Sequence, residues 1–387
     1  MRILIAPDSY KGSLSALEVA RAMKKGMLKV FPEAEIVLAP IADGGEGTVD
    51  ALVTATGGTI VRETVSGPLG EPVDSFWGIL GDSSAAVIEM AAASGLTLIP
   101  EAERNPRVTS SRGTGQLMKS AMDRGFRKLI IGMGGSATND GGAGMARALG
   151  VKFLDSQGWE LPEGGAALSD LAEIDLSGID SRIKETEIAV ACDVDNPLCG
   201  PRGASEVYGP QKGASAEVIK ELDAALENFG KVASMSTGRD VAALPGAGAA
   251  GGMGAGLMFF TPAVLRPGIE IVFEFLGLAS LIQKADIVIT GEGKTDFQTV
   301  FGKAPAGVGD LAGHFGKVAL CISGSLGNGA EKILNHGIQA AVSIVPRPMS
   351  LNECMQSAEI LVEQAADRVA RLLKAGMALT QTRKRDV

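Results

Sequence analysis

The two ends of the chain share one pattern, in which short apolar runs alternate with amphipathic segments. Residues 2–6 and 35–39 form such runs near the start, and residues 286–289, 318–322 and 340–345 continue the pattern near the end. Continuous apolar runs are typical of parallel strands that are buried on both faces, with helices as the connections between them. The pattern predicts one parallel sheet that is built from both ends of the chain.

Helix start signals accompany this pattern at both ends. Ser15 and Glu18 have the spacing of a capping box ahead of an apolar stripe, and Ser350 and Glu353 repeat it. We expect a helix after the first strand, and one final helix whose stripe comprises Leu361, Ala365, Val369 and Leu373.

The middle of the chain has a different pattern of apolar and polar residues. Residues 59–90 alternate between apolar and polar positions around a Gly-Pro turn, which is typical of a hairpin. Further strands and helices follow it. We therefore predict a doubly wound, Rossmann-like α/β domain made of residues 1–58 and 283–387, with a second α/β domain, residues 59–282, inserted into it.

Composition excludes several classes of function. The net charge is −9 and there are only two histidines, which disfavours nucleic-acid binding and His-rich zinc sites. Four widely spaced cysteines and no signal-peptide pattern predict a reducing, cytoplasmic protein. Residues 241–265 carry no charge, but their glycines and prolines argue against a membrane helix. The anomaly is glycine, at 52 of 387 residues.

The glycines gather in loops that follow predicted strands. The first such loop holds Asp8, Ser9 and Lys11, which suit Mg²⁺ or an anionic substrate but equally suit a solvated turn. The second, residues 43–47, places Asp43 and Glu46 around three glycines. It is either a close approach to a ligand or a plain turn.

The third loop, residues 132–142, has the strongest chemical signal. It contains Gly134 and Gly135 and the side chains of Ser136 and Thr138, and a predicted helix follows it. Exposed N–H groups, hydroxyls and the positive end of a helix together suit a phosphate.

The remaining glycine and acidic motifs are less specific. Asp193, Asp195 and Asn196 follow a strand and suit a hard cation or a base, or else an Asx turn. The segment 291–296 imitates the end of a Walker A loop, but Val288 stands where that motif needs glycine. The run 246–251 matches G-x-G-x-x-G without a preceding strand, so we expect glycine packing there rather than a dinucleotide site.

Carboxylates and backbone donors without a metal-binding histidine or a nucleophile elbow fit phosphoryl transfer. In that chemistry the protein mainly positions the reactants and stabilises charge. From the residue types alone, the expectation is an enzyme that acts on a Mg-nucleotide.

Longer motifs make the expectation specific. They include IAPDSYKGSLSA (5–16), ADGGEGTVDAL (42–52), IGMGGSATNDGGAGMARALG (131–150), ACDVDNPLCGPRGAS (191–205), GPQKGA (209–214), ITGEGKTDFQT (289–299) and RPMS (347–350). With these blocks the chain resembles the bacterial glycerate kinase family, type I, over nearly its whole length. The resemblance implies phosphorylation of D-glycerate by ATP and Mg²⁺, usually to 2-phosphoglycerate, in a cleft between two α/β domains.

The resemblance also suggests roles for residues. The nucleotide-binding candidates are Gly134, Gly135, Ser136, Thr138, Asn139, Gly291, Glu292 and Gly293. The catalytic candidates are Asp193, Asp296 and Lys303, and the two aspartates are also the Mg²⁺ candidates. The substrate-binding candidates are Asp8, Ser9, Lys11, Asp43 and Arg347, with Asp8 and Asp43 as alternatives for the base or the metal ligand.

Three other functions stay open at this point. They are a kinase of another small hydroxy acid, a non-catalytic nucleotide-binding regulator, and an NAD-dependent oxidoreductase that depends on the weak motif at residues 246–251. Neither a nucleic-acid partner nor a membrane is expected. A homodimer is left open.

Overall fold

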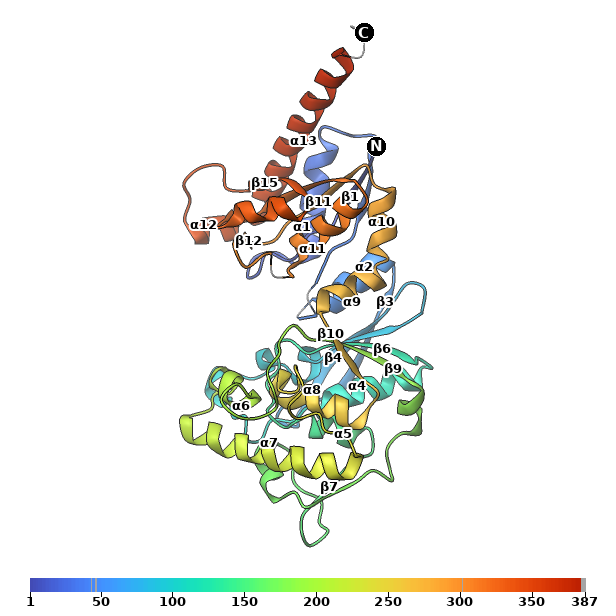
Figure 1. The fold of residues 1–387 in the computed structure, drawn as a ribbon, viewed down its shortest axis with the longest axis vertical. Helices are drawn as coiled ribbons and strands as arrows, with labels where there is room; N and C mark the ends of the chain where they lie inside the picture. Colours follow the sequence, from blue (N-terminus) through green and yellow to red (C-terminus); the bar gives the residue numbers. More distant parts are fainter. Residues whose placement is uncertain (43, 46, 301, 384–387) are drawn as a thin grey trace. The chain divides into compact units, whose positions relative to one another are not determined.

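The chain divides into two compact units, each with its own sheet (Figure 1). The computed structural model describes residues 1–42, 44–45, 47–300 and 302–383. Unit 1 comprises Met1–Asp43, Asp50–Ala55 and Val272–Val387, and unit 2 comprises Gly44–Val49 and Thr56–Ile271. The predicted boundaries of folding domains, after residues 58 and 282, stay a prediction.

The sheet of unit 1 is fully parallel and uses strands from both ends of the chain, as predicted. Its order is β15-β13-β11-β1-β2. Numbered along the unit this is 2-1-3-4-5, a doubly wound order whose topological switch point lies between β1 and β11. The strands are β1 (Arg2–Ile5), β2 (Glu35–Leu38), β11 (Ile287–Thr290), β13 (Val318–Ser323) and β15 (Ile338–Ser343).

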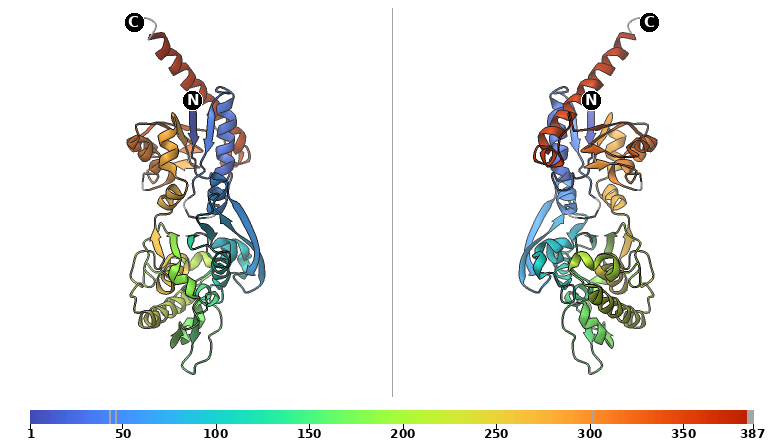
Figure 2. Two further views of the ribbon diagram at one scale, coloured as in Figure 1. Left: turned by 90° about the vertical axis from the view of Figure 1, so that its right-hand side faces the viewer. Right: turned by 90° about the vertical axis from the view of Figure 1, so that its left-hand side faces the viewer.

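Helices cover both faces of this sheet (Figure 2). One face carries α1 (Ala16–Leu28) and α13 (Ala358–Arg383), which pack on the isoleucines of β1 and β11. The other carries α10 (Leu278–Lys284) and α11 (Ala304–His314). Burial on both sides explains the continuous apolar runs of the central strands β1 and β11, whereas the edge strands β2 and β15 are partly exposed.

The two capping boxes are present, but the second one begins a different helix from the one predicted. Ser15 and Glu18 cap α1 reciprocally. Ser350 and Glu353 cap α12 (Leu351–Gln356), a short helix that ends before α13 begins. The single final helix that we predicted was therefore wrong at Ser357, whose N–H bonds the Glu353 carbonyl while its own carbonyl accepts the N–H of Leu361. One serine thus ends one helix and begins the next.

Unit 2 has a mixed sheet in the order β10-β9-β6-β5-β4-β3. β3 and β4 form the predicted antiparallel hairpin, and β5, β6, β9 and β10 pair in parallel. The strands are β3 (Thr59–Ser66), β4 (Pro72–Ile79), β5 (Ala86–Glu89), β6 (Lys128–Gly132), β9 (Glu187–Ala191) and β10 (Val264–Arg266).

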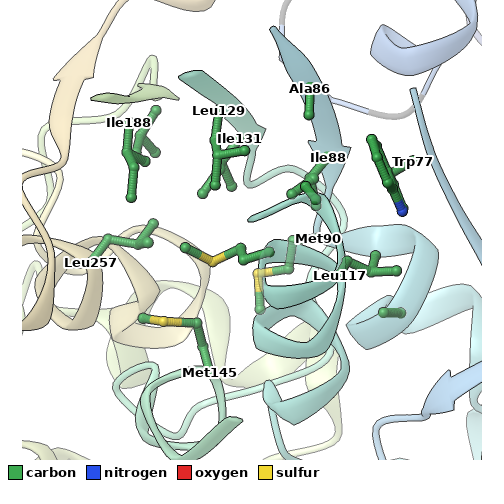
Figure 3. Packing of buried hydrophobic residues seen from close by; sticks show 14 of the residues in the cluster. Trp77, Ala86, Ile88, Met90, Leu117, Leu129, Ile131, Met145, Ile188 and Leu257 are labelled. Carbon is green, nitrogen blue, oxygen red and sulfur yellow. The ribbon is translucent and has the colours of Figure 1, made fainter. Parts of the chain in front are cut away.

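A helical layer packs on this sheet through one apolar cluster (Figure 3). Ile88, Ile131 and Ile188 point from the strands toward Leu117 and Leu257 on helices. The helices are α3 (Ala91–Ser94), α4 (Arg112–Asp123), α5 (Ala143–Ala148), α6 (Ala204–Tyr208), α7 (Ala216–Thr237) and α8 (Ala249–Phe260). None of the helices within the described ranges is long and apolar enough to cross a membrane.

Smaller elements complete the two units. The remaining helices are α2 (Thr48–Thr56) and α9 (Gly268–Phe275). The remaining strands are β7 (Lys152–Leu154), β8 (Glu173–Asp175), β12 (Lys294–Thr295) and β14 (Ser325–Leu326). The 3₁₀ helices are Leu96–Leu98, Glu101–Glu103, Gly165–Asp170, Ser181–Glu185, Pro210–Lys212 and Ala330–His336.

The crossing of α1 and α13 depends on one glycine. A Cβ at Gly26 would clash with the backbone carbonyl of Glu363 and lie 2.7 Å from the Cβ of Ala366. We expect Gly26→Ala to lower the free energy of unfolding by about 1–3 kcal/mol, although alanine favours a helix.

Gly376 of α13 is the matched control, since a Cβ there would meet nothing within 4 Å. Gly376→Ala should leave stability unchanged or raise it by up to about 1 kcal/mol. Urea unfolding of both variants measures the difference. Equal effects of the two substitutions would contradict this account of the helix crossing.

Candidate functional site

Glycine loops of unit 2 meet at the carboxyl ends of β6 and β9. A Cβ on Gly132 would clash with the carbonyl of Gly44, and a Cβ on Gly134 would lie 2.8 Å from the Cα of Gly45. A Cβ on Gly44 would in turn clash with the side chain of Ala191. The glycines therefore permit the second and third predicted loops to touch through their backbones. Asp43 and Glu46 lie outside the described residues.

Glu89 anchors the second loop to the sheet. Its carboxylate accepts the N–H groups of Gly47 at 3.2 Å and Val49 at 2.6 Å, and the residue is only 4% exposed. The carboxylate therefore caps the start of α2. Sequence reasoning missed Glu89, and its signal was a lone acid that ends an otherwise apolar strand.

The third loop is exposed at its start and buried beyond it. Gly134 and Gly135 are exposed, whereas Ser136, Thr138 and Asn139 are buried. The Asn139 amide donates to Ser205 Oγ at 2.9 Å. The Thr138 hydroxyl and the Asn139 amide oxygen are buried without a hydrogen-bond partner among the residues that the structure describes. Such orphaned polar atoms are uncommon in folded proteins and need an explanation.

We expected the positive end of helix α5 to be available to a phosphate, but it is not. The carboxylate of Asp140 accepts the N–H groups of Gly142 and Gly144, each at 3.1 Å, and both the N–H and the hydroxyl of Ser111 at 2.8 Å. Ser111 Oγ also accepts the N–H of Met145. Burial raises the pKa of Asp140, and these hydrogen bonds oppose that shift. The prediction failed because an acid inside the loop itself caps the helix.

Lys212 is the second residue that sequence reasoning missed in this loop. It is 1% exposed, and its ammonium donates to Ser136 Oγ at 2.9 Å and to the Thr138 carbonyl at 2.7 Å. Burial lowers the pKa of this lysine to about 7, against an attraction to Asp140 that raises it. Its motif, GPQKGA, stood out in the sequence without suggesting a role for the lysine.

The fourth predicted loop, after β9, uses most of its polar groups internally. Asp195 pairs with Arg202 at 2.7 Å, and Asn196 accepts the hydroxyl of Tyr208 at 2.7 Å. Asp193 is exposed, and one of its oxygens accepts the N–H of Gly268 at 3.0 Å. Asp193 thus presents a carboxylate at the carboxyl end of β9.

The run 246–251 packs against the third loop, as expected. A Cβ on Gly251 would clash with the Thr138 carbonyl, and a Cβ on Gly252 would lie 2.8 Å from the Cα of Gly141. The run also does not connect a strand to a helix, which a dinucleotide fingerprint requires.

In unit 1, the predicted residues that follow β1 and β11 lie at the switch point of the sheet. The N–H of Asp8, after β1, donates to the carbonyl of Gly291, after β11, at 2.8 Å. Asp8 and Ser9 are half-buried and Lys11 is exposed. Ligands of open α/β sheets bind at this place, where adjacent strands connect in opposite directions.

Glu292 is the buried centre of this cluster. It is 6% exposed, and its Oε1 accepts hydroxyls from Thr299 at 2.6 Å and Thr295 at 3.2 Å. The ammonium of Lys303 lies 3.6 Å from Oε2. Burial raises the pKa of Glu292, and its hydrogen bonds and Lys303 oppose that shift.

Asp296 lies in the same loop and has the opposite electrostatic environment. Its carboxylate accepts the N–H of Gln298 at 2.9 Å and pairs with Lys294 at 3.0 Å. The Gln298 hydrogen bond, followed by Lys294, lowers the pKa of Asp296. Lys294 itself lies in strand β12, so the segment is not a P-loop, as predicted. Arg347 is exposed in the segment after β15.

The structure thus groups the predicted residues into two regions. Asp8, Gly291, Glu292, Asp296 and Lys303 belong to unit 1, whereas the third loop and Asp193 belong to unit 2. In the described part of the chain, no three His, Cys, Asp or Glu residues converge as a metal site.

Comparison with known proteins decides the family. The model of the glycerate kinase family matches residues 3–374. The chain belongs to this family. It is 52% identical to a glycerate kinase of Halalkalibacterium halodurans, an alignment that covers 95% of this chain and 97% of the relative.

Two further glycerate kinase relatives match as fully. A glycerate 2-kinase of Escherichia coli K12 is 50% identical, with 97% of this chain and 99% of the relative covered. A crystal structure assigned to glycerate kinase 2 of Salmonella typhimurium LT2 superimposes with a TM-score of 0.89 at 49% identity. That match covers 98% of this chain and 99% of the other. Like its relatives, this member of the family is a kinase.

The two carboxylates of unit 1 should affect stability with opposite pH dependences. Because folding raises the pKa of Glu292 above 4.5, the folded chain binds more protons than the unfolded chain just above that value. We expect the stability advantage of the wild type over Glu292→Gln to grow as the pH falls through this interval.

Asp296 provides the contrast. Because folding lowers its pKa below 3.8, its contribution is complete above that value and is lost as the pH falls through the lowered pKa. The advantage over Asp296→Asn should therefore shrink. Urea unfolding across a series of acidic buffers measures both differences, and parallel pH dependences would refute the two environments described above.

Proposed function

We propose that this protein transfers the γ-phosphoryl group of ATP to D-glycerate and forms 2-phosphoglycerate. The observation that carries the proposal is the match of about 50% identity, over nearly the whole chain, to relatives that include a glycerate 2-kinase. The two clusters of donors and carboxylates fit this chemistry, since phosphoryl transfer requires positioning and charge stabilisation rather than a covalent nucleophile.

The third loop of unit 2 is our candidate for the ATP phosphates. Gly134 and Gly135 expose their backbone at its start, and the hydroxyl of Ser136 follows directly. Backbone N–H groups with a nearby hydroxyl can surround phosphate oxygens closely because glycine has no side chain. Gly291, Glu292 and Gly293 of unit 1 are the alternative nucleotide contacts. The burial of Thr138 and Asn139 makes both of them supports of the loop rather than its binding surface.

The acceptor hydroxyl needs a carboxylate that is ionised at neutral pH. Asp296, whose neighbours lower its pKa, is ionised at neutral pH and is our first candidate to orient the hydroxyl or to bind Mg²⁺, and exposed Asp193 is the second. The hydroxyl oxygen forms the new P–O bond as its proton passes to the carboxylate, while the bond between the γ-phosphorus and the oxygen of ADP breaks. When bound, Mg²⁺ would neutralise phosphate charge with one of these carboxylates as a ligand.

Cations of unit 1 are suited to the carboxylate of glycerate. Lys11 and Arg347 are exposed, and Lys303 is half-exposed above Glu292. We assign substrate binding to these residues together with Asp8 and Ser9. Asp43 remains an alternative acid.

The four cysteines are all free thiols. On this ground, and because the proposed substrates are intracellular metabolites, we further propose that the enzyme acts in the cytoplasm.

Neutralising either aspartate should reduce turnover. We expect Asp193→Asn and Asp296→Asn each to lower kcat for glycerate-dependent ADP formation by about 100-fold or more, because the reacting oxygen or the metal loses a charged partner. Asp240→Asn, at an exposed aspartate outside all the predicted loops, is the control and should retain wild-type turnover.

A coupled ADP assay measures the rates, and ³¹P NMR identifies the phosphorylated hydroxyl. Near wild-type turnover in both aspartate variants would rule out the proposed site. If the wild type releases ADP with a different hydroxy acid and not with glycerate, that acid is the substrate. If no acceptor stimulates ADP release, the result favours a non-catalytic regulator.

A further inference from the structure

Lys212 is a fully buried lysine, although burial of an ammonium group is unfavourable. The reaction proposed above does not use it. The residue is 1% exposed, and the negative charge that acts on its ammonium is that of Asp140, which is itself buried. A buried ammonium costs several kcal/mol of desolvation, and an apolar side chain of similar length would cost none. The lysine therefore needs a reason other than stability.

The backbone around Lys212 fixes where its side chain points. The residue closes a 3₁₀ turn, Pro210–Lys212, in which its N–H bonds the Gly209 carbonyl at 2.9 Å. Gly213 follows in the left-handed region with φ of 92°, and a Cβ there would lie 2.6 Å from the Arg104 carbonyl. The turn is thus rigid on both sides of the lysine.

From this turn the lysine reaches two successive parts of the third loop. Its ammonium bonds Ser136 Oγ and the Thr138 carbonyl, and Ser205 of the preceding helix holds Asn139. The main chain of Gly135 is tied separately, since its carbonyl accepts the N–H of Leu96 at 2.8 Å. Gly135 and the two residues that follow the exposed glycines in the loop, Ser136 and Thr138, are thus each held by a hydrogen bond from outside the loop.

The bond to Ser136 also determines what its hydroxyl can do. A serine oxygen accepts hydrogen bonds and donates only one. The ammonium of Lys212 donates a hydrogen bond to Ser136 Oγ, so the hydroxyl proton of Ser136 must point in another direction. That proton is therefore free to form a hydrogen bond to an anion. The bond to Thr138 likewise turns a carbonyl oxygen, which would repel a phosphate, toward a cation.

The lysine's charge adds a second effect. In a low-dielectric interior a positive group is screened weakly and acts over several ångströms. Burial lowers its pKa to about 7, which a nearby phosphate would raise again by favouring the charged form. A bound anion and the lysine would therefore stabilise one another.

We propose that Lys212 is a positioning residue, which holds residues 134–138 in the conformation that binds nucleotide phosphates and directs the Ser136 hydroxyl toward them. The proposal rests on the assignment of this loop to the nucleotide. It accounts for a charged side chain in a place where an apolar one would avoid the cost of desolvation.

The test compares Lys212→Met, which keeps the side-chain length and removes the ammonium, with Lys231→Met. Lys231 lies on the helix that follows and pairs with Glu227 on the surface, so it is the matched control. Calorimetry measures the Kd for Mg-ADP, and steady-state kinetics separate the KM for ATP from the KM for D-glycerate.

We expect Lys212→Met to weaken Mg-ADP binding and to raise the KM for ATP by about tenfold or more, which corresponds to about 1.4 kcal/mol. The KM for glycerate should stay within about twofold, and Lys231→Met should match the wild type. Wild-type nucleotide affinity in Lys212→Met would overturn the proposal, and so would equal weakening of both substrates.

The variant Ser136→Ala shows whether Lys212 acts through the Ser136 hydroxyl or affects nucleotide binding independently of it. If the lysine acts through this hydroxyl, Lys212→Met/Ser136→Ala should bind Mg-ADP within about twofold of Lys212→Met alone, because coupled residues are not additive. If the double variant instead loses Mg-ADP affinity by the product of the two single losses, the proposed action through the Ser136 hydroxyl is wrong. If Lys212→Met does not fold, Ser136→Ala decides alone: weakened Mg-ADP binding supports the proposal and unchanged binding overturns it.

Failure of this proposal is distinguishable from failure of the proposed function. Mg-ADP binding requires no acceptor, so the calorimetry remains informative even if the wild type forms no ADP with glycerate. In that case the function fails and the role of Lys212 is judged on binding.

Discussion

Backbone contact at glycine is the constraint on which both site regions depend. Side chains cannot be accommodated at Gly132 or Gly134 where these meet residues 44–45, or at Gly251 where it meets Thr138. The same holds at Gly291, where a Cβ would clash with the carbonyl of Ile322 in the neighbouring strand. The loops after the strands are thus held by close main-chain contact. Much of the glycine excess has this physical cause.

Buried charges provide the second level of order, and each holds a loop rather than a core. Glu89 caps the start of α2, Asp140 caps α5, Lys212 binds the third loop, and Glu292 gathers two threonine hydroxyls in unit 1. Groups of this kind add little net stability, because desolvation offsets their attraction. They do fix geometry, since removing one partner leaves the other buried and unpaired. A kinase that works by positioning needs this property at the residues around its substrates.

The sequence was sufficient for the architecture because apolar runs and capping boxes are local signals. The parallel strands at both ends, the β3–β4 hairpin and the cap of α1 all follow from residues that are close in the chain. Two expectations failed because a hydrogen bond in the folded structure, which the local sequence does not show, determined the outcome. Ser357 divides the final helical region, and Asp140 occupies the helix end that we expected a phosphate to use. Lys212 and Glu89 were missed because their partners lie about 40 or more positions away in the chain.

The central claim is that the exposed glycines of the third loop, held by Lys212, are a surface for phosphate. A crystal structure with Mg-ADP and D-glycerate tests it most directly. The account predicts phosphate oxygens within hydrogen-bond distance of the N–H groups of Gly134 and Gly135 and of the Ser136 hydroxyl. Phosphates bound solely by the segment 291–293 of unit 1, with the third loop empty, would contradict it.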